Sequence, residues 1–123
     1  ALAWFTGADD IAKVKLRTST DGGNNWLETK ILESETPLGR VDVAITPNNI
    51  IWASWMSRVD DTAVIKLASF DENGNQRSMQ VINEVSPSRS GGFPQLELIG
   101  ETKIVAWTDV SENQPRIRTK LIQ

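Results

Sequence analysis

Short apolar runs alternate along this chain with clusters of glycine, asparagine, aspartate, serine and proline. The runs are about five to eight residues long, and their apolar side chains either alternate with polar ones or follow one another directly. Both patterns are typical of β-strands. No stretch keeps the 3.6-residue spacing of an amphipathic helix for more than about two turns. The pattern therefore predicts an all-β fold.

The apolar pattern also repeats with a period of about 50 residues, as propeller blades do. The triplet Val14-Lys15-Leu16 returns 51 residues later as Ile65-Lys66-Leu67, and Ser19-x-Asp21 returns as Ser69-x-Asp71. A small residue before a tryptophan recurs at spacings of 51 and 52 residues. A strand-rich repeat of this length indicates antiparallel β-propeller blades, each a four-stranded sheet. The repeated tryptophans are Trp4, Trp55 and Trp107.

Turn-forming clusters divide the chain into ten predicted strands and about 2.5–3 blades. The blade repeats span roughly 1–35, 36–87 and 88–123, so that the whole of 1–123 is one propeller segment. The first repeat lacks its opening strand and the third its closing strand. The predicted strands lie near 1–6, 12–19 and 27–33, then 40–46, 50–57, 63–70 and 78–85, then 94–99, 103–108 and 115–122.

An unclosed stack of blades leaves strand edges and apolar faces in water. We therefore expect either that this segment belongs to a longer ring, or that copies self-associate. In the second case, a homodimer of three-blade chains would close a ring of about six blades.

The segment Ser19-Thr20-Asp21-Gly22-Gly23-Asn24-Asn25-Trp26 has the chemistry of a tight hairpin loop. The carboxylate of Asp21 can accept hydrogen bonds from backbone N–H groups of the turn. Gly22 and Gly23 allow backbone angles that other residues avoid. Trp26 supplies a large apolar side chain that can fold back over the loop.

This octapeptide resembles the Asp-box, or BNR repeat, of sialidase-like β-propellers, although Asn25 replaces the common threonine. The second repeat keeps Ser69 and Asp71 but lacks the tryptophan. The resemblance implies a propeller fold and a structural role for the box, on the face opposite the ligand site. It also favours a secreted or periplasmic location, which the sequence itself leaves unknown. The structural box residues are Ser19, Asp21, Gly23 and Trp26.

Composition narrows the possible functions. The chain has no histidine, cysteine or tyrosine, which excludes histidine triads, thiol chemistry, disulfides and the tyrosine nucleophile that the resemblance to sialidases would imply. Its net charge of −3 and pI of about 4.9 argue against nucleic-acid binding. No apolar run is long enough for a membrane helix. No cofactor or metal is expected, because Asp71-x-Asn73-x-Asn75 fits a hairpin turn better than a calcium loop.

The candidate ligand residues gather on the loops opposite the box. Arg40, Arg58 and Arg89 could bind a carboxylate or sulfate of an acidic sugar or peptide, or could pair with surface aspartates. The acidic pairs in equivalent loops could act in acid/base hydrolysis or simply keep the loops soluble. These pairs are Asp9/Asp10, Asp60/Asp61 and Asp109/Glu112.

The tryptophans could stack on sugars, but their regular placement favours packing between sheets. Alternation places Trp52 and Trp55 on opposite faces of one strand, each towards a different neighbour. These observations favour a non-catalytic binding or scaffold module for a carbohydrate or acidic ligand. The alternatives are a part of a sialidase-like glycoside hydrolase or lyase, active only in a longer or assembled propeller, and a purely structural role.

Overall fold

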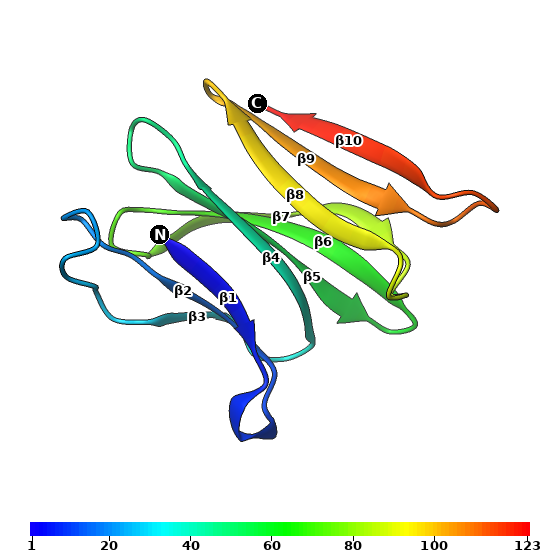
Figure 1. Cartoon of the computed structure of the whole chain (residues 1–123), viewed down its shortest axis with the longest axis horizontal. Helices are drawn as coiled ribbons and strands as arrows, with labels where there is room; N and C mark the ends of the chain where they lie inside the picture. The colour runs from blue at the N-terminus through cyan, green and yellow to red at the C-terminus, as the bar shows by residue number, and fades with distance from the viewer.

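The computed structural model describes all 123 residues, which form ten antiparallel strands in three sheets (Figure 1). The only helical element is a short 3-10 turn, η1 (Ala8–Asp10). Sheet 1 contains β1 (Leu2–Thr6), β2 (Lys13–Arg17) and β3 (Lys30–Glu33). Sheet 2 contains β4 (Pro37–Ile45), β5 (Ile51–Val59), β6 (Thr62–Phe70) and β7 (Gln76–Val85). Sheet 3 contains β8 (Gly92–Ile99), β9 (Thr102–Asp109) and β10 (Arg116–Ile122).

The predicted all-β class and the ten strands are confirmed, and the strand bounds agree within two residues except at the starts of β3 and β4, which differ by three. β3 begins at Lys30 rather than near residue 27, because the preceding residues belong to the long loop after β2. β4 begins at Pro37 rather than at residue 40, and its first part pairs irregularly with β5. Within each sheet the strands follow one another in chain order.

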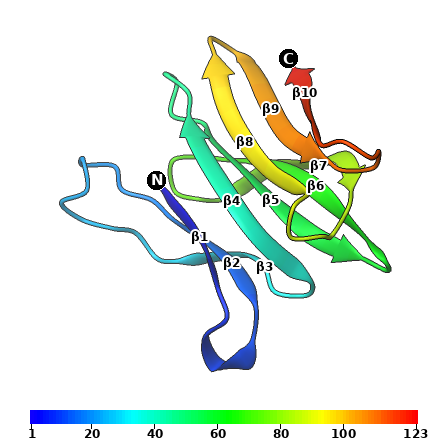
Figure 2. The same cartoon turned by 45° about the vertical axis from the view of Figure 1, so that its right-hand side comes forward.

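Sheet 2 lies between the other two sheets, as both views show (Figures 1 and 2). It therefore has a hydrophobic core on each face. The core against sheet 1 contains Val14, Leu16, Ile51, Ala53, Trp55, Ala68 and Phe70. The core against sheet 3 contains Met56, Ala63, Ile65, Leu67, Ile82, Leu96, Val105 and Trp107.

Strand alternation produces these two cores from the same strands. On β5, Trp55 packs against sheet 1, whereas Trp52 packs against the core shared with sheet 3. The expectation that these tryptophans face different neighbours is confirmed. Trp107 packs towards sheet 2, while Trp4 pairs with Lys15 on the outer face of sheet 1 and stays half-buried.

Two β-bulges occupy equivalent places in sheets 1 and 2. In sheet 1 the register shifts between Val14 and Lys15, which leaves Leu32 as the extra residue of β3. In sheet 2 it shifts between Ile65 and Lys66, which leaves Ile82 as the extra residue of β7. Because each bulge adds one residue to the outer strand, the residues after it, Glu33 and Asn83, also hold equivalent positions.

The loops gather at opposite ends of the stack (Figure 1). The Asp21 end carries the β2–β3, β4–β5, β6–β7 and β8–β9 connections. The Asp60 end carries the β1–β2, β5–β6 and β9–β10 loops and the two connectors between sheets. No helix in the structure has the length and apolar character needed to cross a membrane.

Candidate functional site

Asp21 organises the β2–β3 loop. Its Oδ1 accepts hydrogen bonds from the Asn25 backbone N–H (2.8 Å) and the Ser19 hydroxyl (2.8 Å), and its Oδ2 accepts one from the Asn25 side chain (2.7 Å). Gly22 and Gly23 have positive φ angles of 71° and 92°. These hydrogen bonds lower the pKa of Asp21, with the Asn25 backbone contributing most. Asp21 therefore shapes the loop, and its oxygens are occupied by the loop itself.

The β6–β7 turn repeats this arrangement around Asp71. Asp71 Oδ1 accepts from the backbone N–H groups of Asn73 and Asn75, each at 2.9 Å, and Oδ2 accepts from the Asn75 side chain (2.9 Å). The segment is the hairpin turn expected from its sequence. A Cβ added to Gly74 would meet Lys30, Leu16 and Thr18 of sheet 1 within 3.3–3.8 Å. The Asp71 turn thus packs against the neighbouring sheet.

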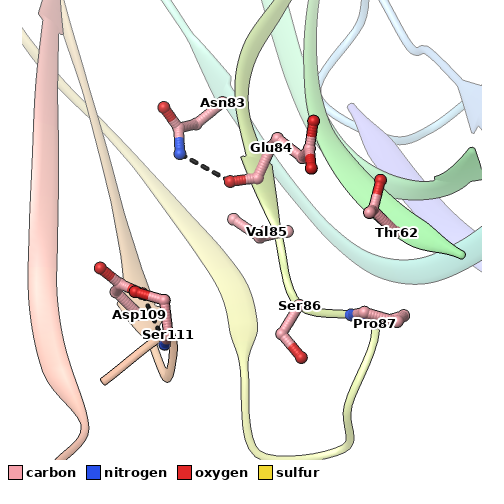
Figure 3. Close-up of a pocket in the computed structure, with 8 residues that line it drawn as sticks. All are labelled: Thr62, Asn83, Glu84, Val85, Ser86, Pro87, Asp109 and Ser111. Carbon is pink, nitrogen blue, oxygen red and sulfur yellow. Dashed lines mark hydrogen bonds between the residues drawn. The ribbon is translucent and has the colours of Figure 1, made fainter.

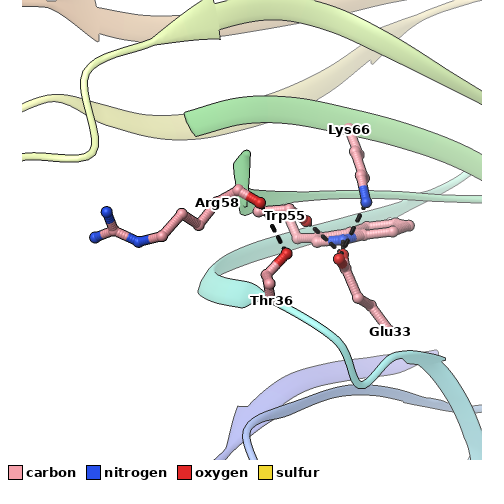
Figure 4. Close-up of polar contacts among 6 residues, drawn as sticks. Glu33, Thr36, Trp55, Arg58 and Lys66 are labelled. Carbon is pink, nitrogen blue, oxygen red and sulfur yellow. Dashed lines mark hydrogen bonds and ion pairs between the residues drawn. The ribbon is translucent and has the colours of Figure 1, made fainter. Parts of the chain in front are cut away.

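A buried carboxylate joins sheets 1 and 2 near the Asp60 end. The Glu33 side chain, 9% exposed, accepts hydrogen bonds from the Trp55 indole N–H and the Ser57 hydroxyl (Figure 4). The Lys66 ammonium lies 3.0 Å from Glu33 Oε1. Glu33 comes from β3, whereas its three partners come from β5 and β6. We call this cluster the Glu33 latch, because it ties two sheets together.

The latch keeps Glu33 ionised. Burial alone would raise the pKa of Glu33, but the hydrogen bonds from Ser57, Trp55 and Lys66 and the positive charge of Lys66 outweigh burial and lower it. The carboxylate therefore stays charged at neutral pH.

The equivalent positions between sheets 2 and 3 carry different residues. Strand pairing matches Trp55–Lys66 with Trp107–Arg118, Ser57 with Asp109, and Glu33 with Asn83. Here the ion pair lies within sheet 3, since Arg118 Nε is 3.0 Å from Asp109 Oδ2. Arg118 belongs to β10 and Asp109 to the neighbouring strand β9. The Asn83 amide donates to the Glu84 carbonyl (2.7 Å) rather than crossing to sheet 3. No latch therefore forms at this interface.

A groove of about 340 Å³ lies where the second latch would be (Figure 3). Asp109 and Ser111 stand on one side, and Glu84 and Thr62 on the other, with Val85 and Ser86 between them. We call it the β7–β9 groove, because it separates the end of β7 from the end of β9. Its lining is polar apart from Val85 and Pro87 and consists of Thr62, Asn83, Glu84, Val85, Ser86, Pro87, Asp109 and Ser111.

Asp109 is the most strongly perturbed carboxylate of the groove. Hydrogen bonds from Ser111, followed by the guanidinium of Arg118, lower the pKa of Asp109 to about 2. Asp109 is therefore ionised at neutral pH and is suited to accept hydrogen bonds. No cation pairs with Glu84 on the opposite side.

Arg40, one of the predicted ligand residues, connects sheets 2 and 3 in the structure. Its guanidinium donates to the Gly91 carbonyl and, at 3.0 Å, to the Ser88 carbonyl, and lies 4.1 Å from the centre of the Phe93 ring. Burial lowers the pKa of Arg40. Its backbone has a positive φ of 54°, which is rare for a residue other than glycine.

The other predicted ligand residues lie at the Asp60 end but outside the groove lining. Arg58 points away from the Glu33 latch, and its backbone pairs with Thr36 (Figure 4). Arg89 is exposed in the β7–β8 connector. Asp60 and Asp61 form the exposed β5–β6 turn, next to the groove residue Thr62.

The three predicted acidic pairs have separate surroundings. Asp9 and Asp10 lie in the η1 turn, both with positive φ. Of the third pair, Asp109 lines the groove, whereas Glu112 forms an ion pair with Arg116 at 2.8 Å. The structure thus brings only Asp109 into the groove.

Sequence reasoning missed Glu33, Lys66 and Asn83, which decide whether each interface is latched. A usable signal was present, because Ile31-Leu32-Glu33 and Val81-Ile82-Asn83 lie 50 residues apart. Their first two residues are aliphatic in both triplets, and only the last differs in chemical type. The bulges that align these triplets, however, leave no composition signature in either strand.

Comparisons with protein-family models, with curated proteins and with solved structures give no match for this chain. The geometry of the two interfaces is therefore the basis for assigning a function.

Proposed function

We propose that this protein is a propeller-type binding module of the Asp-box kind, in which each sheet is one blade and the β7–β9 groove holds the ligand. The blade assignment is supported by the chain order of the strands, by the hydrophobic core on each face of sheet 2 and by the equivalent loops around Asp21 and Asp71. The box residues Ser19, Gly23 and Trp26 serve the loop fold at the end opposite the groove.

One observation carries the proposed binding function. At the first interface Glu33 crosses to Lys66 and borders a hollow of about 320 Å³, whereas at the second the equivalent Asn83 stays on its own side and Asp109 binds Arg118 of its own sheet. Asp109 and Asn83 each have a partner on their own sheet, but they do not bond to each other across the groove, so that their remaining lone pairs and N–H can face a ligand. The groove volume lies at the small end of the range for ligand sites.

The chemistry of the lining fits a carbohydrate. Sugar hydroxyls pair with amides, hydroxyls and carboxylates, which Asn83, Ser111 and Asp109 supply. A neutral or amine-bearing sugar fits better than an acidic one, because Glu84 adds an unpaired negative charge. Arg40, which could have attracted an acidic ligand, is engaged by backbone carbonyls.

Binding is better supported than hydrolysis. Glycoside hydrolysis requires a carboxylic acid that is still protonated at working pH. The pKa of Asp109 is lowered to about 2, which is the opposite of what a general acid needs. The hydrolase or lyase alternative therefore gains no support from this groove.

The test is to build the missing latch. The double variant Asn83→Glu/Asp109→Ser gives the second interface the glutamate and the serine that Glu33 and Ser57 supply at the first. The new side chains lie beside Trp107 and Arg118. We expect the new carboxylate to cross the seam, take up the polar groups of the groove lining and abolish sugar binding without loss of folding. Binding is measured by amide NMR shifts of Ser86 and Ser111 on titration with millimolar galactose, glucosamine and sialic acid.

The control is Glu72→Gln, which lies at the Asp21 end and leaves the groove unchanged. We expect this variant to bind like the parent chain, with glucosamine or galactose causing larger shifts than sialic acid. Shifts that persist in the latched variant, or a parent chain that responds to none of the three sugars, would contradict the proposal.

A further inference from the structure

Both outer sheets of the stack present an unpartnered face. The sheet 3 open face combines apolar side chains with the polar Gln95, Thr108 and Thr119 and carries a single charge, Glu97. The sheet 1 open face consists of apolar side chains with three cations, Lys13, Lys15 and Arg17. The exposed apolar residues are Leu2 and Ile31 on sheet 1, and Phe93, Ile99, Ile117 and Leu121 on sheet 3.

The sheet 3 open face repeats a surface that the protein buries twice. Strand pairing places Val14, Ile65 and Ile117 at one position of the three sheets. Val14 and Ile65 are 0% exposed because sheets 2 and 3 cover them, whereas Ile117 is 71% exposed. The position is the same, and only the next sheet is missing.

The sheet 1 open face is the complementary half of that contact. Trp4, Trp55 and Trp107 share one position, from which Trp55 and Trp107 pack against the preceding sheet. Trp4 occupies it with no preceding sheet and remains half-buried. One molecule therefore exposes both halves of an interface that it also forms twice internally.

We propose that the sheet 3 open face of one molecule docks onto the sheet 1 open face of a second copy, head to tail. The internal contacts between sheets provide the template. Charge selects the arrangement, since head-to-tail docking brings Glu97 towards a face carrying only cations, whereas like-face docking would set cations against cations or Glu97 against Glu97. A heterologous contact of this kind closes a ring when its rotation allows, and two copies give six sheets.

The test pairs two variants that each lose one face. Ile117→Glu/Leu121→Glu disables the sheet 3 open face, and Lys15→Glu/Ile31→Glu disables the sheet 1 open face. Light scattering after size exclusion should give the parent chain a mass of twice 13.6 kDa and each variant a mass of 13.6 kDa. An equimolar mixture of the variants should recover the two-chain mass through the one intact contact.

The control is Val81→Glu on β7, a position about as exposed (55%) as Ile31 (57%) and outside both open faces, which should keep the parent mass. Circular dichroism and thermal melts establish that every variant is folded. A parent chain that stays at 13.6 kDa overturns the proposal. So does a variant that still self-associates alone, because that result means like-face docking, and so does a mixture that stays monomeric.

Discussion

The two interfaces between sheets share positions, tryptophans and a surface hollow of about 320–340 Å³, yet only at the first does a glutamate from the outer strand cross to the next sheet. Between sheets 1 and 2, Glu33 reaches across to Trp55, Ser57 and Lys66. Between sheets 2 and 3, the carboxylate has moved to Asp109, on the same sheet as its cation. At these equivalent positions each interface keeps one anion and one cation, although Asp42 and Lys120 also form hydrogen bonds between sheets 2 and 3. Whether this ion pair crosses the seam depends on which sheet carries the anion.

The difference separates packing from polar bonding. Both interfaces bury a tryptophan and a set of aliphatic side chains, so that hydrophobic burial holds both together. The Glu33 carboxylate adds directional bonds that fix the outer strand β3 against β5 and β6. An ion pair within one sheet adds nothing across the seam; there the Lys120 ammonium donates to the Ile82 carbonyl at 3.1 Å, and the end of β7 beyond this bond borders a groove.

The largest expected effect comes from removing the latch. Glu33→Ala leaves the Trp55 N–H, Ser57 and Lys66 without their shared acceptor, and should cost about 3 kcal/mol of unfolding free energy. Asn83→Ala at the equivalent position should cost less than about 0.5 kcal/mol, because its amide is exposed and bonds only to a neighbouring carbonyl. Urea unfolding measures both, and equal losses would contradict the comparison.

Arg40 stabilises the second interface. Arg40→Ala removes two hydrogen bonds to the β7–β8 connector and the contact with Phe93, and should cost about 2 kcal/mol. Arg40→Gly loses the same contacts but relieves the positive φ, and should be about 1 kcal/mol more stable than Arg40→Ala. Thermal melts of the two variants give this difference. If they melt together, the left-handed backbone is not a source of strain.

Acid should weaken the latched interface. The folded-state pKa of Glu33 is lowered from its ordinary 4.5. The ionised carboxylate therefore stabilises the fold fully above about pH 5, and this stabilisation is lost as the pH falls below 4.5 and through the lowered pKa. Glu33→Gln cannot ionise and should lie about 1 kcal/mol below the parent chain at pH 7. That gap should narrow towards pH 3. Melts at several pH values provide the check, and a gap independent of pH would mean that the charge contributes nothing.

The smallest effect concerns the two aspartate-centred loops. Asp71→Ala should loosen a turn that packs on sheet 1, whereas Asp21→Ala should loosen a loop that extends from the stack. We expect faster amide hydrogen exchange at Asn75 and Asn25 respectively. Only Asp71→Ala should also speed exchange in sheet 1, at Leu16. Equal spread from both loops would show that the turn does not support the interface.

The fold was largely accessible from the sequence, because strand count depends on local apolar runs and turn residues. The period of the Trp4, Trp55 and Trp107 segments placed equivalent strands correctly. The extent of β3 was overestimated, since Leu27 belongs to the loop that Asp21 organises and its backbone N–H bonds to Thr18. The apolar side chain of Leu27 gives no sign that its backbone belongs to the loop rather than to the strand.

The candidate site was less accessible, because it depends on contacts between sheets. Nothing about Arg40 in the sequence shows that the carbonyls of Ser88 and Gly91 would occupy its guanidinium. Likewise, Glu33 and Asp109 differ in their choice of partner, which is set by where Lys66 and Arg118 stand after pairing. Long-range partners of charged side chains follow from the assembled sheets.

At the bulges in β3 and β7, two adjacent residues of one strand have different roles. In a regular strand, neighbouring side chains point to opposite faces, so only one of two can reach the adjoining sheet. The extra residue at each bulge lets Leu32 and Ile82 fill the apolar layer while the next residue, Glu33 or Asn83, decides whether a side chain bonds across the seam. Exchange of that second residue can therefore remove the polar bridge between two sheets without repacking the interior.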